Sequence, residues 1–152
     1  KELRIMEYKH TLPIGAKLQS PKRVYTIERV LGQGGFGITY KVSAKIKVEN
    51  VTVRTYFAIK EFFMKELNSR GEDGSITGMS DSSLSQNYCQ KFKKEAINLS
   101  RLDYPNIVRV TDSFSENGTF YYVMDFIEGQ NLNDYIKSHY IDEAEAVSII
   151  KW

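Results

Sequence analysis

Three closely spaced glycines, Gly32, Gly34 and Gly37, form a G-x-G-x-x-G pattern within the sequence LGQGGFGIT at residues 31–39. Glycine has no Cβ atom, so such a loop bends tightly and brings its backbone N–H groups close to a ligand, as phosphate binding requires. The pattern alone fits three structures: a dinucleotide-binding turn, a loop that covers nucleotide phosphates, or an ordinary hairpin. The residues that follow the glycines decide among them.

Apolar and polar residues alternate from residue 38 to 48, which indicates a strand rather than the helix that a dinucleotide-binding turn requires. The alternation resumes with the opposite phase over residues 51–59, so a two-residue turn at Glu49 and Asn50 predicts a hairpin. This turn fixes the register, which pairs Val48 with Val51, Ile46 with Val53, Val42 with Phe57, Tyr40 with Ile59, Thr39 with Lys60 and Lys41 with Ala58.

The predicted register brings Lys60 to the end of the hairpin at which the glycine loop lies. A lysine there could reach phosphates beneath the loop, although a strand lysine can equally be a solvated side chain. Glu95 lies on the apolar stripe of a helix predicted from about residue 87 to 102. A carboxylate that faces inward needs a partner, and Lys60 is the candidate; the alternative is a boundary glutamate that reaches water.

The remaining pattern predicts an α+β fold with five antiparallel strands and one helix. Further strands are expected over residues 24–31, 107–114 and 119–127, the last two joined by a hairpin at Asn117-Gly118. We expect a loosely packed, extended arm before residue 24 and a mobile loop over residues 64–86, whose serines could be phosphorylation sites. Helical segments are expected at about residues 131–138 and from residue 142 onward.

Composition indicates ordinary globular material, with 152 residues of which 41% are hydrophobic and 26% charged. The net charge of +2 gives no reason to expect a nucleic acid or an anionic membrane as partner, and one cysteine with two histidines predicts no metal site. No secretory leader or membrane span is visible, so a cytoplasmic setting is expected. The chain begins with Lys1 rather than Met, which suggests a piece of a longer protein.

In this order along the chain, the motifs resemble the N-terminal lobe of a eukaryotic-type (Ser/Thr) protein kinase, followed by the start of its C-terminal lobe. The resemblance spans about residues 25–152. Residues 31–37 resemble the glycine-rich loop, and Phe57-Ala58-Ile59-Lys60 resembles the V-A-I-K strand. Glu95 stands at the place of the αC glutamate. Residues 102–108 are similar to the L-x-H-P-N-I-V segment, and residues 122–129 are similar to the hinge.

The resemblance implies an extended N-terminal arm over residues 1–23, an ATP-binding lobe over residues 24–128, and a hinge exit with an incomplete C-terminal lobe over residues 129–152. It also implies ATP as cofactor, with Lys60 contacting the α and β phosphates while it pairs with Glu95. Met124 would be the gatekeeper, and Asp125 and Ile127 would offer hinge backbone groups. The other ATP-binding residues would be Leu31, Gly32, Gln33, Gly34, Gly35, Phe36, Gly37, Thr39, Ala58 and Asn131.

No H-R-D, D-F-G or A-P-E motif occurs in the sequence. The resemblance places the catalytic base and the Mg ligands in those motifs, so we expect this chain alone to be catalytically inactive. The alternative is a pseudokinase-like module that uses the fold for protein contacts. The apolar residues after Asn131 would pack against the missing lobe, so their exposure could lead to self-association.

Overall fold

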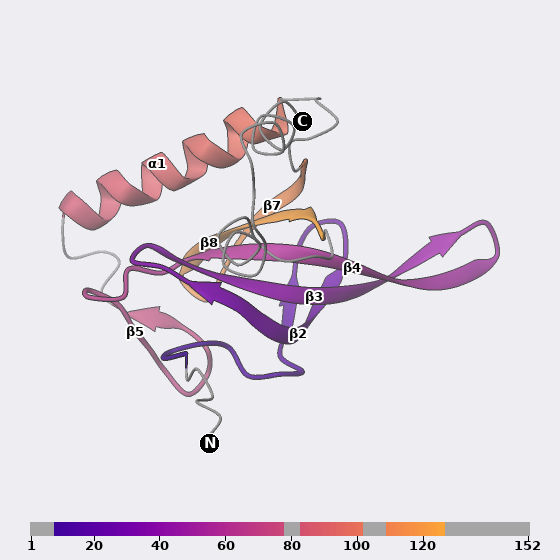
Figure 1. The fold of residues 1–152 in the computed structure, drawn as a ribbon, viewed down its shortest axis with the longest axis horizontal. Coiled ribbons are helices and arrows are strands. Elements are labelled where there is room, and N and C mark those ends of the chain that lie inside the picture. Colours follow the sequence, from indigo (N-terminus) through magenta and orange to yellow (C-terminus); the bar gives the residue numbers. More distant parts are fainter. Residues whose placement is uncertain (1–7, 78–82, 102–108, 127–152) are drawn as a thin grey trace, which may run out of the picture.

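The computed structural model of the chain describes residues 8–77, 83–101 and 109–126. Within these residues, six strands form one curled antiparallel sheet in the order β1-β2-β3-β4-β8-β7, and the helix α1 lies across one face of it (Figure 1). This arrangement confirms the predicted α+β class. The elements of the sheet and the helix are β1 (Lys17–Gln19), β2 (Val24–Gln33), β3 (Gly37–Val48), β4 (Val51–Phe62), α1 (Ser83–Ser100), β7 (Val110–Glu116) and β8 (Thr119–Asp125).

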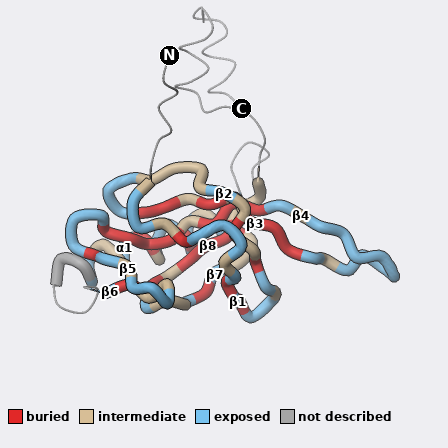
Figure 2. The backbone as a smooth tube through the Cα atoms, turned by 90° about the horizontal axis from the view of Figure 1, so that it is seen from below, coloured by how far each residue is buried: buried red, intermediate tan, exposed pale blue. Residues whose placement is uncertain are grey.

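The long β3–β4 hairpin has the register that the alternation predicted. Val48 pairs with Val51 and Thr39 pairs with Lys60, with every pair between them in step. Glu49 in the turn has a φ of 55°, the left-handed conformation that a tight two-residue hairpin turn needs. The outer end of the hairpin projects beyond the rest of the sheet and is exposed (Figure 2), so its valines do not join the core.

The sheet is buried on both faces because alternate residues of β4 and β8 enter two different cores. On one face, Phe57 and Ile59 pack with Tyr121 and Val123 in the larger core. On the other face, Phe62 and Tyr122 pack beneath Phe92 and Ala96 of α1. Each such side chain contributes about 1.5–3 kcal/mol when fully buried, so α1 is held by its apolar stripe.

The expectation that the N-terminal segment packs loosely is wrong for its described residues. Leu12 and Leu18 are 5% and 0% exposed and belong to the larger core. β1 pairs with β2 and adds a sixth strand to the five that were predicted. The spacing of Leu12 and Leu18 among prolines and glycines gave no periodic signal, so burial here depends on the tertiary structure.

The expectation of a mobile loop after residue 64 is wrong for the described residues up to 77. β5 (Ser69–Arg70) and β6 (Ile76–Thr77) form a small hairpin. It is anchored to the main body because Ile76, 7% exposed, packs in the larger core and its N–H donates to the carbonyl of Asn117 at 2.8 Å. The helix also begins earlier than expected, at Ser83.

The expected start of β7 at Ile107, the end of β8 at Ile127 and the helices after residue 130 lie outside the described residues. Self-association through the apolar residues after Asn131 therefore stays a prediction. No helix in the described part of the chain is both long and apolar enough to cross a membrane.

Candidate functional site

A cavity of about 510 Å³ lies between the glycine loop and α1. The end of β2 and the start of β3 form its roof, while Lys60 of β4 and Glu95 of α1 face it from the opposite side. Its volume falls in the range of small-molecule sites in proteins. The cavity is lined by Gly32, Gln33, Gly34, Gly35, Phe36, Gly37, Thr39, Lys60, Phe62, Tyr88, Lys91, Phe92 and Glu95.

Lys60 and Glu95 lie in contact, with 3.5 Å between Lys60 Nζ and Glu95 Oε1. Glu95 reaches Lys60 but is not fully buried, because 49% of its side chain is exposed at the edge of the cavity. The Lys60 side chain is 32% exposed. Water therefore screens the pair, and we assign it little stabilisation. Its significance is that it places an ammonium group directly beneath the glycine loop.

Tyr122 holds Glu95 from the core side, and the sequence reasoning missed this residue. The Tyr122 hydroxyl donates a hydrogen bond of 2.9 Å to Glu95 Oε1, the same atom that Lys60 contacts. Burial, with the adjacent Glu95 carboxylate, raises the pKa of Tyr122, so the phenol stays protonated and can donate. Tyr122 pairs with Lys60 in the β4–β8 register and so faces the same side of the sheet, but these strands are distant in the sequence and local periodicity does not give their pairing.

The glycine loop is anchored at both sides of its tip. Phe63 N donates to the carbonyl of Phe36, and Lys65 N donates to that of Gly35, both at 3.1 Å. The Phe36 ring stacks on Tyr88 of α1, with 4.4 Å between the ring centroids and 24° between the planes. These contacts connect the loop to the strand that carries Lys60 and to the helix that carries Glu95.

The three glycines of the pattern differ in what surrounds them. A Cβ atom added at Gly32 or Gly34 would meet no atom within 4 Å, so these glycines border open space. A Cβ atom at Gly37 would lie 3.2 Å from both the backbone oxygen of Glu61 and Cε of Lys60. Gly37 therefore permits the close approach of the Lys60 side chain to the loop.

Replacing Gly37 with alanine is expected to lower the free energy of unfolding by about 1–2 kcal/mol, because the new methyl group must displace Lys60 or the β4 backbone. Gly34→Ala is the matched control, since it adds the same methyl group in open space and is expected to change stability far less. Urea denaturation of the two variants measures the difference. Equal losses would show that Gly37 has no special packing role.

The residues assigned to the adenine lie on neighbouring strands. Thr39 lines the cavity, and Ala58, 8% exposed, pairs directly with Met124. Leu31, Ala58, Met124 and Asp125 lie outside the cavity lining. The Asp125 N–H is engaged with the carbonyl of Arg109 at 3.3 Å. Ile127 and Asn131 lie outside the described residues.

A buried polar network lies on the other face of β4, and the sequence reasoning missed it as well. Glu61 is 0% exposed, and its carboxylate pairs with Arg70, whose side chain is 6% exposed. Tyr40 Oη donates to Glu61 Oε1 at 3.0 Å, and Tyr121 Oη donates to the other carboxylate oxygen. Desolvation by burial raises the pKa of Glu61 even though Arg70 opposes the shift.

Arg70 extends this network to two backbone carbonyls. It donates from Nε to the carbonyl of His10 and from its first terminal nitrogen to that of Gly74, each at 2.7 Å. The network thus connects the N-terminal segment, β4 and the β5–β6 hairpin. It lies outside the cavity lining, so we interpret it as structural.

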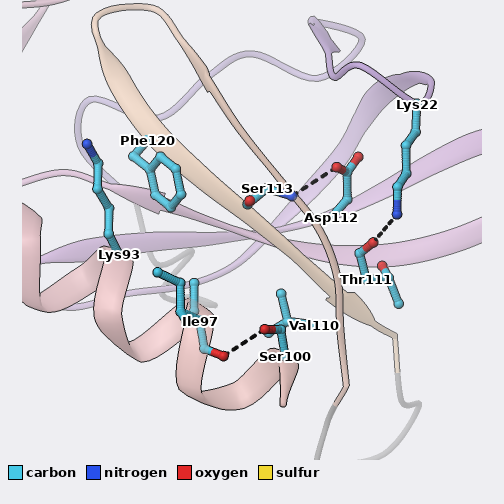
Figure 3. Close-up of a pocket in the computed structure, with 10 residues that line it drawn as sticks. Lys22, Lys93, Ile97, Ser100, Val110, Thr111, Asp112, Ser113 and Phe120 are labelled. Atoms are coloured by element: carbon cyan, nitrogen blue, oxygen red, sulfur yellow. Dashed lines mark hydrogen bonds between the residues drawn. The ribbon is translucent and has the colours of Figure 1, made fainter. Parts of the chain in front are cut away.

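A second cavity of about 510 Å³ lies between α1 and the strands β7 and β8 (Figure 3). Its polar groups are engaged within the protein. Lys22 Nζ donates to the carbonyl of Thr111 at 2.7 Å, and Asp112 accepts from the Tyr25 hydroxyl at 2.9 Å. Ala96, Ile97, Val110 and Phe120 supply much of the remaining lining. This composition gives no indication of chemistry.

Comparison with known sequences gives one family. Residues 25–152 match the protein kinase domain. A serine/threonine-protein kinase of Caenorhabditis elegans is 35% identical over 112 residues, which cover 74% of this chain and 10% of that protein. The human serine/threonine-protein kinase tousled-like 2 is 31% identical over 128 residues, which cover 83% of this chain and 14% of that protein. The chain thus spans only a small part of each of these relatives.

Solved structures with a similar fold are also found. The apo form of PpkA-294 matches with a TM-score of 0.74 and 28% identity, covering 90% of this chain and 46% of the other. The kinase domain of PknI from Mycobacterium tuberculosis matches with a TM-score of 0.60 and 19% identity, covering 92% of this chain and 47% of the other, which supports the fold alone.

Proposed function

Because this chain belongs to the protein kinase domain family, we propose that it is the ATP-binding lobe of a kinase that transfers the γ-phosphate of ATP to serine or threonine of a protein when it is complete. The observation that carries this proposal is the contact between Lys60 and Glu95 beneath the glycine loop. The names of the relatives support the choice of serine and threonine.

The residues that line the cavity fit a nucleoside triphosphate. Gly32, Gly34 and Gly35 border open space, so phosphates can approach the loop backbone without meeting a side chain. The Lys60 ammonium lies in the same cavity and supplies positive charge for the α and β phosphates. Glu95 orients that ammonium and is itself held by Tyr122, since Lys60 Nζ and the Tyr122 hydroxyl both contact Glu95 Oε1.

On the adenine side, we propose that Leu31, Thr39 and Ala58 cover the base and that Met124 limits the depth of the pocket. The N–H of Asp125 already donates to Arg109, so its carbonyl is the group that would accept from adenine. Ile127 would offer a second hinge group and Asn131 would lie near the ribose. These roles come from the resemblance between the motifs.

We propose that the 152-residue chain alone does not catalyse phosphoryl transfer. Magnesium bridges and neutralises the phosphates in this family, and its ligands come from motifs that are absent from these residues, as does the catalytic base. A pseudokinase-like interaction module is the second candidate. The retention of Gly32, Gly34, Gly37 and the Lys60–Glu95 pair favours the enzyme.

Titration of the ¹⁵N-labelled chain with Mg·ATP tests the proposal. We expect amide shifts confined to Gly32–Gly37, Lys60 and their neighbours, with a dissociation constant in the millimolar range or weaker because half of the nucleotide site is absent. Lys60→Met is expected to remove these shifts. Tight magnesium-dependent binding would contradict the predicted incompleteness of the site, and shifts located elsewhere would contradict the site itself.

A further inference from the structure

A basic groove of about 600 Å³ lies on the sheet between the β1–β2 turn and the β3–β4 hairpin, away from the nucleotide cavity. Five of the nine residues that line it are lysine or arginine, and none is acidic. The lining consists of Lys17, Lys22, Arg23, Val24, Thr26, Ser43, Ala44, Lys45 and Arg54. This concentration exceeds what the whole chain suggests, since its net charge is only +2.

The positive charges in the groove are only partly neutralised within the described residues. Arg54 pairs with Glu28, which also accepts from the Ser43 hydroxyl. The other interactions involve neutral oxygens: Lys22 Nζ donates to a backbone carbonyl of β7, and Lys17 Nζ lies 3.5 Å from the Thr26 hydroxyl oxygen.

The pairing of the strands brings like charges together. Lys45 lies directly opposite Arg54 in the β3–β4 register. Like charges at directly opposed positions destabilise a sheet. An anion bound in the groove would relieve this repulsion, and the hydroxyl of Thr26, which lines the same groove, can donate a hydrogen bond to it.

We propose that this groove binds a phosphate group carried by a polypeptide, namely a phosphoserine or phosphothreonine segment of a protein partner. A phosphate offers several acceptor oxygens to the lysines, the arginines and the Thr26 hydroxyl. Val24, 41% exposed at the edge of the groove, offers apolar contact to a neighbouring side chain of such a segment. The groove is concave, which suits such a segment better than a flat membrane, and the net charge of +2 gives no reason to expect a nucleic acid.

The position of the groove relates it to the proposed kinase function, on which this choice of partner rests. Thr39, Ser43 and Lys45 are separated by even numbers of residues along β3, so they share one face of the hairpin. Lys45 is about 20 Å along the strand from Thr39, at about 3.3 Å per residue. A segment held in the groove would therefore already be near the nucleotide cavity, as a docked kinase substrate requires.

Fluorescence anisotropy of the 152-residue chain with a labelled alanine-glycine peptide that carries one central phosphoserine tests the proposal. We expect binding that weakens as salt is added, and at least about tenfold weaker binding in the double variant K17A/K45A, because each lysine supplies a charge-assisted hydrogen bond. K47A/K94A is the matched control. It removes the same charge, and Lys47 lies on the same strand and face as Lys45 but outside the groove.

The remaining measurements separate this proposal from its alternatives. Equal loss in K17A/K45A and K47A/K94A, equal binding of the unphosphorylated peptide, or stronger binding to phosphatidylserine vesicles than to the peptide would each overturn it. Loss of peptide binding in K60M would also overturn it, because the phosphate would then occupy the nucleotide cavity. Retained peptide binding in K60M, with ATP shifts at Gly32–Gly37 unaltered in K17A/K45A, would support two separate sites.

Discussion

Replacing Arg70 with methionine is expected to lower the free energy of unfolding by about 3–5 kcal/mol, because it leaves the buried carboxylate of Glu61 without its counter-charge. Glu61 and Arg70 are 0% and 6% exposed, so water cannot replace the lost partner. The variant also loses the hydrogen bonds from Arg70 to His10 and Gly74. Urea denaturation followed by circular dichroism measures the change.

Two controls isolate the effect of burial. Adding Glu61→Gln to Arg70→Met removes the buried charge while keeping an acceptor for the hydroxyls of Tyr40 and Tyr121, so the double variant is expected to regain much of the loss. Arg54→Met breaks the Arg54–Glu28 pair at the surface, where Arg54 is 58% exposed, and is expected to leave stability nearly unchanged. Equal losses in R70M and R54M would refute the argument from burial.

The stability loss in R70M also carries a pH signature. Burial holds the pKa of Glu61 above its ordinary value, and Arg70 lowers it. Removing Arg70 therefore raises the pKa of Glu61 further, and the folded variant takes up a proton more readily than the unfolded chain does. A raised carboxyl pKa gives stability that is lost as pH rises through the folded-state value. The loss is thus expected to be largest near neutral pH and to shrink as pH falls toward 4.5.

The hairpin that carries Lys60 was predictable because its register depends on local information. A period of two and a two-residue turn leave one way to pair the strands, since a slip by one residue would place every apolar side chain on the wrong face. The pairing of Thr39 with Lys60 follows from that pattern alone. The kinase-like arrangement of the glycine loop and Lys60 was therefore accessible from the sequence.

Glu61 and Arg70 were not found, for a physical reason. The odd-numbered residues of β4 face the larger core, and continuing that phase beyond Ile59 places Glu61 inside. The alternation that predicted this strand was followed through Ile59 and Lys60 and not to Glu61, and a glutamate is almost never fully buried unless it is paired. Its partner Arg70 lies in a segment rich in glycine and serine, whose packing is decided by tertiary contacts and not by periodicity.

Glu95 was found from the sequence, but the orientation of its side chain could not be predicted. Its place on the apolar stripe of α1 left open an inward carboxylate paired with Lys60 or a boundary glutamate that reaches water. In the structure Glu95 contacts Lys60, and half of its side chain is exposed at the edge of the cavity. A helical position fixes direction only to within the width of the stripe. The hydroxyl of Tyr122 and the ammonium of Lys60 set the final orientation, and both come from other elements.

In a complete kinase that contains this chain, Lys60→Met is expected to reduce kcat by about 10²–10³-fold, because it removes a positioned charge that stabilises the phosphates during transfer. Glu95→Gln is expected to lower kcat as well, but by a smaller factor, since Lys60 keeps its charge and loses only its ionic partner. Autophosphorylation from radiolabelled ATP, measured over a range of ATP concentrations, separates the effect on kcat from that on KM.

Tyr122→Phe tests whether the buried phenol positions the Lys60–Glu95 pair. It removes a single hydroxyl, and the half-exposed Glu95 can take a water in its place, so we expect a loss of activity of about tenfold or less. A purely packing role would leave activity unchanged, because the ring remains. Lys94→Met is the matched control for Lys60→Met, since Lys94 is exposed on α1 outside the cavity lining. Full activity in K60M, or equal losses in K60M and K94M, would refute the assignment of Lys60 and support the interaction-module alternative.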